Sequence, residues 1–222
     1  MLKIIIGIIV IVGLGCAVRG VFHLRAVAAR NQQEMAPYFG EKPAYTASLG
    51  KTLVIYYSKT GHTQAVAQRV AQYTGGELYA IETQKPFSNV PWLALSLRRQ
   101  LKSGQYPVLK EPLPDVSAYD TVFVGAPVWW YTAATPLLAF LQQMDFKGKA
   151  VVFFSTQGSN YGTYFKDVRA KAKNARLLPG AAFNNLDASY DAAVDNKILT
   201  WLNGLQTAPE KEVLVGEQFH HK

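Results

Sequence analysis

Residues 52–70, TLVIYYSKTGHTQAVAQRV, contain two different hydrophobic patterns with a polar stretch between them. The first six residues form a short apolar run rich in β-branched and aromatic side chains, which is typical of a buried strand. From residue 63 the apolar residues recur at helical spacing and stop at a pair of glycines, which predicts a helix over 63–76. The sequence therefore predicts a strand, a short polar loop and a helix in direct succession.

The same alternation continues from residue 51 to residue 206. Further apolar runs predict strands at 77–82, 121–126, 150–155 and 175–183, the last one interrupted by a proline and a glycine. Helical spacing predicts helices at 135–144, 162–173 and 189–205, and a further one within 90–104. Strands that alternate with helices at this spacing predict an α/β fold with a parallel sheet covered on both faces. Continuous apolar strands agree with burial on both sides.

The first 30 residues carry an uncharged apolar stretch, 4–18, between Lys3 and Arg19. Its length is just below the roughly 17 to 25 apolar residues of a typical membrane-spanning helix. We expect residues 1–30 to form an apolar N-terminal helix that anchors the protein in the cell membrane. Two alternatives stay open: a signal peptide cleaved near residues 26–28, and lipidation of Cys16.

Positive charges after the apolar stretch predict its orientation. Arg19, Arg25 and Arg30 follow it, and positive flanks tend to stay in the cytoplasm. We therefore expect a cytoplasmic main domain, with export after signal cleavage as the alternative. Residues 31–50 contain two prolines and two glycines without any sustained period and are expected to be a linker. Residues 207–222 are expected to be a polar C-terminal tail.

The net charge of +8 does not point to nucleic acid. Half of it lies in residues 1–30, and no Lys/Arg run elsewhere forms a basic stripe of the nucleic-acid-binding kind. The densest cluster, Arg98, Arg99 and Lys102, is either a solvated helix face or a contact for an acidic partner or anionic headgroups. A single cysteine excludes an internal disulfide, and no Cys/His cluster has the spacing of a zinc site.

A polar loop follows the first predicted strand, at residues 58–63. In open parallel sheets, ligands bind outside the carboxyl ends of the strands. A helix N-terminus favours an anion there, because its first N–H groups lack partners inside the helix. Ser58, Thr60 and Thr63 add hydroxyl donors, and Gly61 permits a close turn. The loop is therefore either a phosphate site or an ordinary capped turn; it matches neither GxxxxGK[ST] nor GxGxxG.

Two further loops follow the third and fourth predicted strands. Residues 125–131, GAPVWWY, contain three consecutive aromatic residues, which either cover a flat ligand or belong to the core or a partner interface. Residues 155–162, STQGSNYG, either present polar groups to a heterocycle or form a common turn. A phosphate loop, aromatic residues and a polar loop at one sheet edge together predict a site for a phosphorylated planar cofactor.

With these motifs the chain resembles the flavodoxin family over residues 51–206. Ser58-x-Thr60-Gly61-x-Thr63 is similar to the family's phosphate loop, and APVWW and STQGS resemble the two following loops of a branch with Pro-x-Trp-Trp. The resemblance implies a flavodoxin-like three-layer sandwich, a five-stranded parallel sheet in the order 2-1-3-4-5, and bound FMN.

The resemblance also implies which residues touch the cofactor. It assigns the phosphate to Ser58, Thr60, Gly61, His62 and Thr63. It assigns the flanks of the isoalloxazine ring to Pro127, Val128, Trp129, Trp130 and Tyr131. It assigns the polar edge of the ring to Thr156, Gly158 and Ser159. The chain departs from the family at His62, where a small polar residue is common, and in its positive net charge, where many small electron carriers are acidic.

Three functions are compatible with these features. The first is a membrane-tethered FMN protein that transfers electrons to a redox partner protein or a quinone-like acceptor. The second is an NAD(P)H:quinone-type reductase, although the sequence contains no separate nicotinamide-binding motif. The third is a membrane-anchored interaction module without redox function. No catalytic residue is assigned, and a hydrolase is disfavoured because GxSxG is absent.

Overall fold

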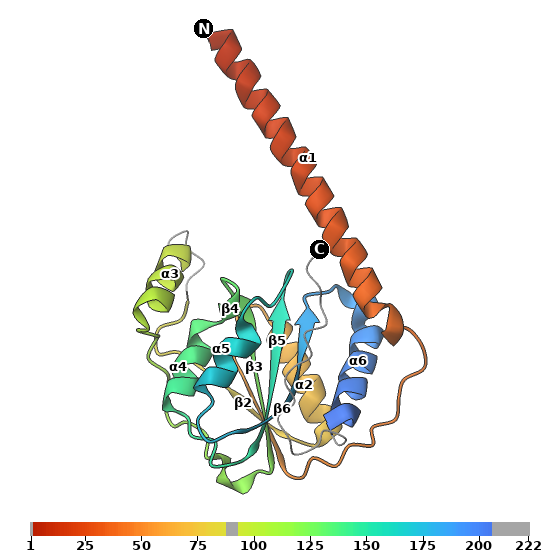
Figure 1. Ribbon diagram of the computed structural model, residues 1–222, viewed down its shortest axis with the longest axis vertical. Helices are drawn as coiled ribbons and strands as arrows, with labels where there is room; N and C mark the ends of the chain where they lie inside the picture. The colour runs from red at the N-terminus through yellow and green to blue at the C-terminus, as the bar shows by residue number, and fades with distance from the viewer. Residues whose placement is uncertain (1, 88–92, 206–222) are drawn as a thin grey trace.

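A computed structural model describes residues 2–87 and 93–205, with the backbone alone for residues 2–17, 93 and 94. A parallel sheet with the strand order β2-β1-β3-β5-β6 forms its centre (Figure 1). Its strands are β1 (Thr52–Tyr56), β2 (Glu77–Ala80), β3 (Thr121–Trp129), β5 (Ala150–Gln157) and β6 (Arg176–Asn184), and a short strand β4 (Thr132–Ala133) pairs antiparallel with β3. Residues 88–92 and the predicted tail at 207–222 lie outside the described residues.

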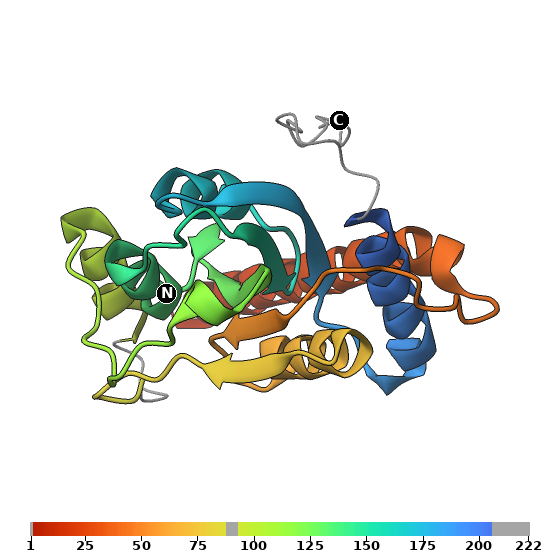
Figure 2. The same ribbon diagram turned by 90° about the horizontal axis from the view of Figure 1, so that it is seen from below.

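Helices cover both faces of the sheet, which confirms the predicted three-layer sandwich (Figures 1 and 2). One layer holds α2 (His62–Thr74) and α6 (Asp191–Gly204), and the other holds α3 (Leu93–Ser103), α4 (Thr135–Gln143) and α5 (Tyr164–Lys171). Short 3-10 helices span Ala36–Tyr38, Val116–Ala118 and Ala188–Tyr190. Successive strand residues point to opposite layers, so Val54 packs toward α2 and Ile55 toward α4; both are fully buried.

The predicted number of strands is wrong, because the sheet has six strands and not five. The predicted third strand ended at residue 126, but β3 continues to Trp129. Pro127 still pairs with Thr156 of β5, and Val128 then pairs with Ala133 of β4. The chain after Pro127 is therefore a β-hairpin, which supplies the additional short strand. The five parallel strands themselves lie in the predicted order.

Strand β6 is continuous despite its proline. Val152 pairs with Leu178 and Phe154 with Ala181, so that two residues of β6, Pro179 and Gly180, stand opposite one residue of β5. This is a β-bulge, and a bulge on an edge strand accommodates a residue without an N–H group. The interruption predicted from the sequence is thus an irregularity within one strand.

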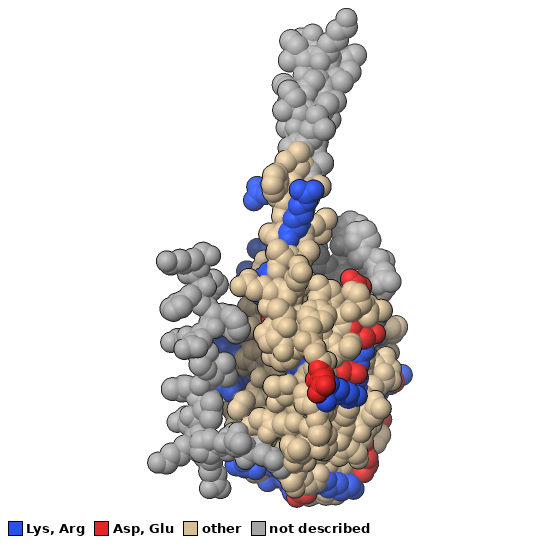
Figure 3. Space-filling model, turned by 90° about the vertical axis from the view of Figure 1, so that its right-hand side faces the viewer, with Lys and Arg blue, Asp and Glu red and all other residues tan. Residues whose placement is uncertain are grey.

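The N-terminal helix α1 (Leu2–Met35) stands out from the domain at the end where the arrowheads of β5 and β6 lie (Figure 1). Arg19, Arg25 and Arg30 are exposed along it, and Figure 3 shows basic side chains on the helix above the domain. In the part of the chain described with side chains, no helix has the length and apolar character needed to cross a membrane. The predicted membrane anchor is therefore not supported; most of its apolar stretch, 4–17, lies among residues described by their backbone alone.

The segment expected as a linker, 31–50, lies against α6. Met35 is only 2% exposed and packs into the α2–α6 layer. Asn196 of α6 donates hydrogen bonds to the backbone oxygens of Tyr38 (2.9 Å) and Gly40 (3.2 Å). Sequence periodicity did not reveal this docking, because the contacts join residues more than 150 positions apart.

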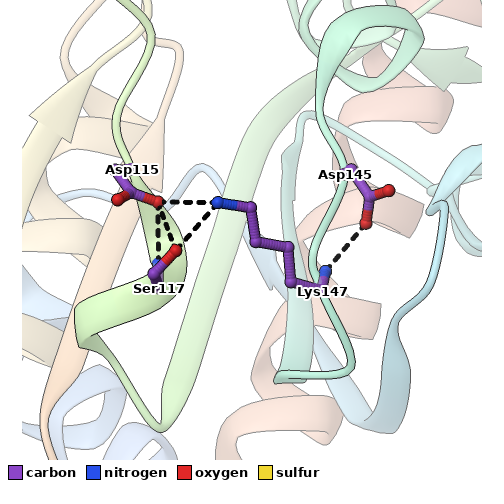
Figure 4. A network of polar contacts seen from close by, with 4 residues as sticks. All are labelled: Asp115, Ser117, Asp145 and Lys147. Atoms are coloured by element: carbon purple, nitrogen blue, oxygen red, sulfur yellow. Dashed lines mark hydrogen bonds and ion pairs between the residues drawn. The ribbon is translucent and has the colours of Figure 1, made fainter.

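A separate polar network fastens the loops that precede β3 and β5 (Figure 4). Asp115 accepts hydrogen bonds from the backbone and hydroxyl of Ser117 and from the Lys147 ammonium. These bonds lower the pKa of Asp115 to about 2. Asp145 accepts from the Lys147 backbone and from Asn174, and its pKa is lowered as well. The network lies at the amino ends of the strands, the edge opposite the predicted site.

Candidate functional site

The first polar loop leaves β1 and opens α2. Ser58 Oγ accepts a hydrogen bond from the backbone N–H of Gly61 at 3.1 Å. Gly61 adopts the left-handed conformation (φ 92°) immediately before α2, which begins at His62. The first backbone hydrogen bond of α2 joins the Ala65 N–H to the Gly61 oxygen, so the N–H groups of residues 62–64 lie before the first hydrogen bond of the helix. With Thr60, Gly61 and His62 exposed, the loop presents donors to solvent and suits an anion.

A buried pair of hydroxyl groups joins this loop to the end of β5. Thr63 and Thr156 are 1% and 2% exposed, and their Oγ1 atoms lie 2.7 Å apart. Each hydroxyl carries one hydrogen, and one of the two is used between them. The other hydrogen remains for a third acceptor. The first and third predicted loops therefore meet in one place.

Aromatic rings connect the end of β1 to the end of β3. Trp129 packs edge-on against Tyr57 (centroids 5.5 Å apart) and Phe87 (5.3 Å), and Tyr57 also contacts Phe87. Burial raises the pKa of Tyr57 to about 12, so this phenol stays neutral at physiological pH. Trp129 is half-buried in this cluster. The sequence did not single out Tyr57 or Phe87, because their role appears only once the two strand ends are neighbours.

The next two residues form a strained turn. Trp130 and Tyr131 have φ values of 51° and 63°, and they connect β3 to β4 as a two-residue hairpin loop. Loops with two positive φ values normally contain Asn-Gly, because large side chains are disfavoured there. Trp130 and Tyr131 are also 55% and 64% exposed. Strain and exposure of two large aromatic residues at one turn point to a functional role.

The turn is held in place by the start of α5. The backbone oxygen of Tyr131 accepts hydrogen bonds from the N–H (2.7 Å) and the hydroxyl (3.2 Å) of Thr163. The Asp167 carboxylate accepts from the hydroxyls of both Thr163 and Thr132. A side chain at Gly162 would approach the Tyr131 oxygen to 2.2 Å, so glycine is required for this contact. The second and third loops are thereby fixed to each other.

Beneath the loops, Tyr164 ties β3 to β5. Its hydroxyl accepts from the Ala126 N–H at 3.1 Å and donates to the Phe154 oxygen at 2.7 Å. Tyr164 is fully buried, and burial raises its pKa. The Tyr164 hydroxyl therefore bonds to both β3 and β5 below the site.

The third loop turns outward after β5. Gly158 and Ser159 are exposed, and a side chain at Gly158 would meet no atom within 4 Å. Gln157, immediately before them, is 4% exposed and donates to the Asn184 side chain at 3.1 Å. The loop therefore has an exposed polar backbone at Gly158 and Ser159, and it begins at a buried, hydrogen-bonded residue, Gln157.

All thirteen predicted site residues lie at the carboxyl edge of the sheet, on or directly after β1, β3 and β5. Four of these residues were predicted in loops and lie in strands instead. Pro127, Val128 and Trp129 are strand residues, and Thr156 is the penultimate residue of β5. The contacts of these residues with a ligand stay predictions.

The donors and rings at this edge fit the parts of FMN. The N–H groups and hydroxyls around Gly61 suit a dianionic phosphate. The exposed Trp130 and Tyr131 provide flat surfaces for a ring, and the open backbone at Gly158 allows a heterocycle to approach closely.

Fold and site together define an open, doubly wound α/β protein with a donor-rich loop at the start of α2 and exposed aromatic residues at the same edge of the sheet. The chain belongs to the flavodoxin family, whose sequence pattern matches residues 51–203. Residues 1–50 precede this match.

Solved structures share the fold. A candidate flavoprotein from Bacteroides uniformis is 28% identical, with a TM-score of 0.59 over 70% of this chain and 99% of that chain. One from Bacteroides eggerthii is 26% identical, with a TM-score of 0.57 over 70% and 98%. A flavoprotein in complex with FMN from Lactobacillus acidophilus is 24% identical and has the same fold (TM-score 0.55, 60% and 93% covered).

One curated relative is an NAD(P)H dehydrogenase (quinone) of Cupriavidus metallidurans. It is 27% identical over 95 residues, which is 43% of this chain and 47% of that protein. The match therefore spans about half the length of this relative.

Proposed function

We propose that this protein binds FMN at the carboxyl edge of its sheet and transfers electrons through the bound flavin. The observation that carries the proposal is the Thr63–Thr156 hydroxyl pair, because it joins the anion-binding loop to the loop after β5. A ligand with a phosphate at one end and a planar ring at the other can contact both loops and the Trp130–Tyr131 turn. Membership of the flavodoxin family supports this ligand.

The chain's own residues divide the work of binding. The N–H groups at the start of α2 and the hydroxyls of Ser58, Thr60 and Thr63 bind the phosphate. Trp130 and Tyr131 flank the ring and limit the access of water. Backbone groups at Gly158 and Ser159 bond to the polar edge of the ring. FMN itself supplies one- and two-electron chemistry when it is bound.

The charges of the site favour the reduced, more negative cofactor. Residues 58–63, 127–131 and 155–163 contain no aspartate or glutamate, and Lys59 adds a positive charge. The Asp167 carboxylate behind the aromatic turn accepts hydrogen bonds from Thr132 and Thr163. We expect a reduction potential above that of flavodoxins with acidic loops. A potentiometric titration that gives an equally low potential for the second electron contradicts this expectation.

A reductase activity is the second candidate. The similarity to an NAD(P)H dehydrogenase (quinone) favours it over a pure electron carrier. The chain lacks a nicotinamide-binding motif of its own, so NAD(P)H and a quinone-like acceptor would both have to reach the exposed side of the flavin. A carrier would instead exchange electrons with a redox partner protein.

Two measurements test these proposals. Purified full-length protein incubated with FMN should show a flavin absorbance spectrum that survives gel filtration, and Thr60→Ala should weaken retention. A protein that remains colourless after reconstitution contradicts the binding proposal. Steady-state oxidation of NAD(P)H with a soluble quinone then separates the two redox functions: turnover supports the reductase, and its absence supports the carrier.

A further inference from the structure

We propose that the last turn of α1 is part of the cofactor edge, and that Glu34 positions the loop after β5 through Asn184 and Gln157. The inference deepens the function proposed above and rests on it where FMN affinity is concerned. It assigns a role to a segment that precedes the part of the chain matched by the flavodoxin family, residues 51–203.

A continuous chain of side-chain hydrogen bonds connects α1 to β5. Asn184, the last residue of β6, donates to Asn31 Oδ1 and to Glu34 Oε2, each at 2.9 Å. The side-chain oxygen of Asn184, Oδ1, accepts from the side-chain NH2 group of Gln157 at 3.1 Å. The side-chain oxygen of Gln157, Oε1, in turn accepts from the Ser155 hydroxyl at 2.9 Å.

The carboxylate of Glu34 sets the direction of every bond in this chain. A carboxylate only accepts hydrogen bonds, so the Asn184 NH2 group must face it and the Asn184 oxygen must face Gln157. The Gln157 NH2 group must then face Asn184, which leaves the Gln157 oxygen for the Ser155 hydroxyl. The orientation of two buried amides beside the site is therefore determined by the last turn of α1, where Glu34 and Asn31 both accept from the Asn184 NH2 group.

The chain is shielded from water and anchored at its outer end. Ser155, Gln157 and Asn184 are 0%, 4% and 8% exposed. Lys197 of α6 donates to Glu34 Oε1 at 2.8 Å, with only 12% of the lysine side chain exposed. Hydrogen bonds in such a setting are stronger than at the surface, and a lost partner is costly.

The inner end of the chain adjoins the residues predicted to touch the flavin. Gln157 is the last residue of β5, and Gly158 and Ser159 follow it directly. Thr156, on its other side, bonds to Thr63 of the phosphate loop. A displacement of Glu34 therefore acts on Gln157, where the third loop begins, and on the Thr156–Thr63 contact with the first loop. A movement of α1 should thereby displace the residues that are predicted to contact the flavin.

Glu34→Gln tests this coupling in the full-length protein. The variant keeps the shape of the side chain but replaces an accepting oxygen with a donor, so it cannot accept from both Asn184 and Lys197 as before. Glu77→Gln is the matched control. Glu77 also bonds to a lysine, Lys51 (3.1 Å), and to a hydroxyl, that of Tyr119 (2.8 Å), but it starts β2 at the opposite edge.

Two readouts decide the outcome. Amide hydrogen exchange of residues 158–163 in the FMN-free protein should be faster in Glu34→Gln than in the wild type, and unchanged in Glu77→Gln. The Kd for FMN, from quenching of flavin fluorescence, should rise roughly two- to thirtyfold in Glu34→Gln, the range typical of mutations along coupled contact networks. If residues 158–163 of Glu34→Gln exchange at the wild-type rate, or if exchange is equally accelerated across β1, the proposal is overturned.

Hydrogen exchange is measured without FMN and therefore does not depend on the proposed function. If the wild type binds no FMN, the proposed function fails, and the exchange comparison still decides whether α1 positions the loop. If Glu34→Gln does not fold, Asn31→Ala replaces it, since it removes one acceptor of Asn184 and leaves the Lys197 pair intact. Faster exchange at 158–163 in Asn31→Ala supports the coupling, and unchanged exchange overturns it.

Discussion

Replacing Thr63 with valine removes one hydroxyl from the pair that joins the phosphate loop to the end of β5. The two side chains have nearly the same shape, so packing is retained. The 2.7 Å bond to Thr156 is lost, and the Thr156 hydroxyl stays buried, at 2% exposed, without its partner. The hydrogen predicted to bond to the FMN phosphate is lost as well.

Two magnitudes follow from this geometry. A buried hydroxyl left without a partner lowers the free energy of unfolding by about 1 to 3 kcal/mol. When Thr156 is also changed to valine, both polar groups are gone, so the double variant should recover part of that loss. A hydrogen bond to a charged acceptor contributes about 1.5 to 3 kcal/mol, so the Kd for FMN should rise about 10- to 150-fold in Thr63→Val.

Urea unfolding of the FMN-free protein measures the first magnitude, and fluorescence titration of FMN measures the second. Thr63→Ser is the matched control, because it keeps the hydroxyl and should bind FMN more tightly than Thr63→Val. A Thr63→Val protein that binds FMN within twofold of the wild type refutes the predicted role of this hydroxyl. A double variant less stable than the single one refutes the assignment of the pair.

Three further substitutions probe the frame around the site. Gly125→Ala would bring a methyl group to within 2.0 Å of the Phe154 ring, so the free energy of unfolding should fall by about 1 to 3 kcal/mol in urea denaturation. Burial raises the Tyr57 pKa from 10.0 to about 12, so its stabilising effect is full below pH 10 and is lost as the pH rises toward 12; Tyr57→Phe should flatten this alkaline decline in thermal unfolding. Bonds from Ser117 and Lys147 lower the Asp115 pKa from 3.8 to about 2, so its stabilising effect is present above pH 3.8 and is lost as the pH falls through 2. Asp115→Asn should therefore lose less stability than the wild type over that acid range.

Each of these three has a clear contrary result. Unchanged urea midpoints in Gly125→Ala would mean that Phe154 moves aside without cost. Stability curves of Tyr57→Phe that run parallel to the wild type from pH 9 to 12 would show that this phenol does not contribute. Stability curves of Asp115→Asn that run parallel to the wild type from pH 5 to 2 would exclude Asp115 as a source of acid sensitivity.

The general fold and the location of the site could be predicted because they depend on local patterns. Apolar runs of strand length alternate with helical periods, and such alternation leaves few topologies other than a parallel sheet covered on both sides. The carboxyl ends of parallel strands then share one edge. Loops that follow β1, β3 and β5 must therefore meet. The Thr63–Thr156 contact joins the first to the third, and the bonds from Thr163 to the Tyr131 oxygen join the second to the third.

Other features could not be predicted because local preferences point elsewhere. Two large aromatic residues are unfavourable in a turn with positive φ, yet Trp130 and Tyr131 form it, held by Thr163 and Asp167 from the start of α5. The docking of residues 31–50 depends on partners in α6 that are distant in sequence. Hydrophobic periodicity carries no information about such contacts.

The structure of the FMN-loaded protein tests the central claim most directly. The account predicts the phosphate within hydrogen-bond distance, about 2.7 to 3.2 Å, of the N–H groups at the start of α2 and of the Thr63 hydroxyl, with the ring beside Trp130 and the backbone of Gly158. A flavin bound away from these three loops, or a protein that takes up no flavin under saturating conditions, would contradict it.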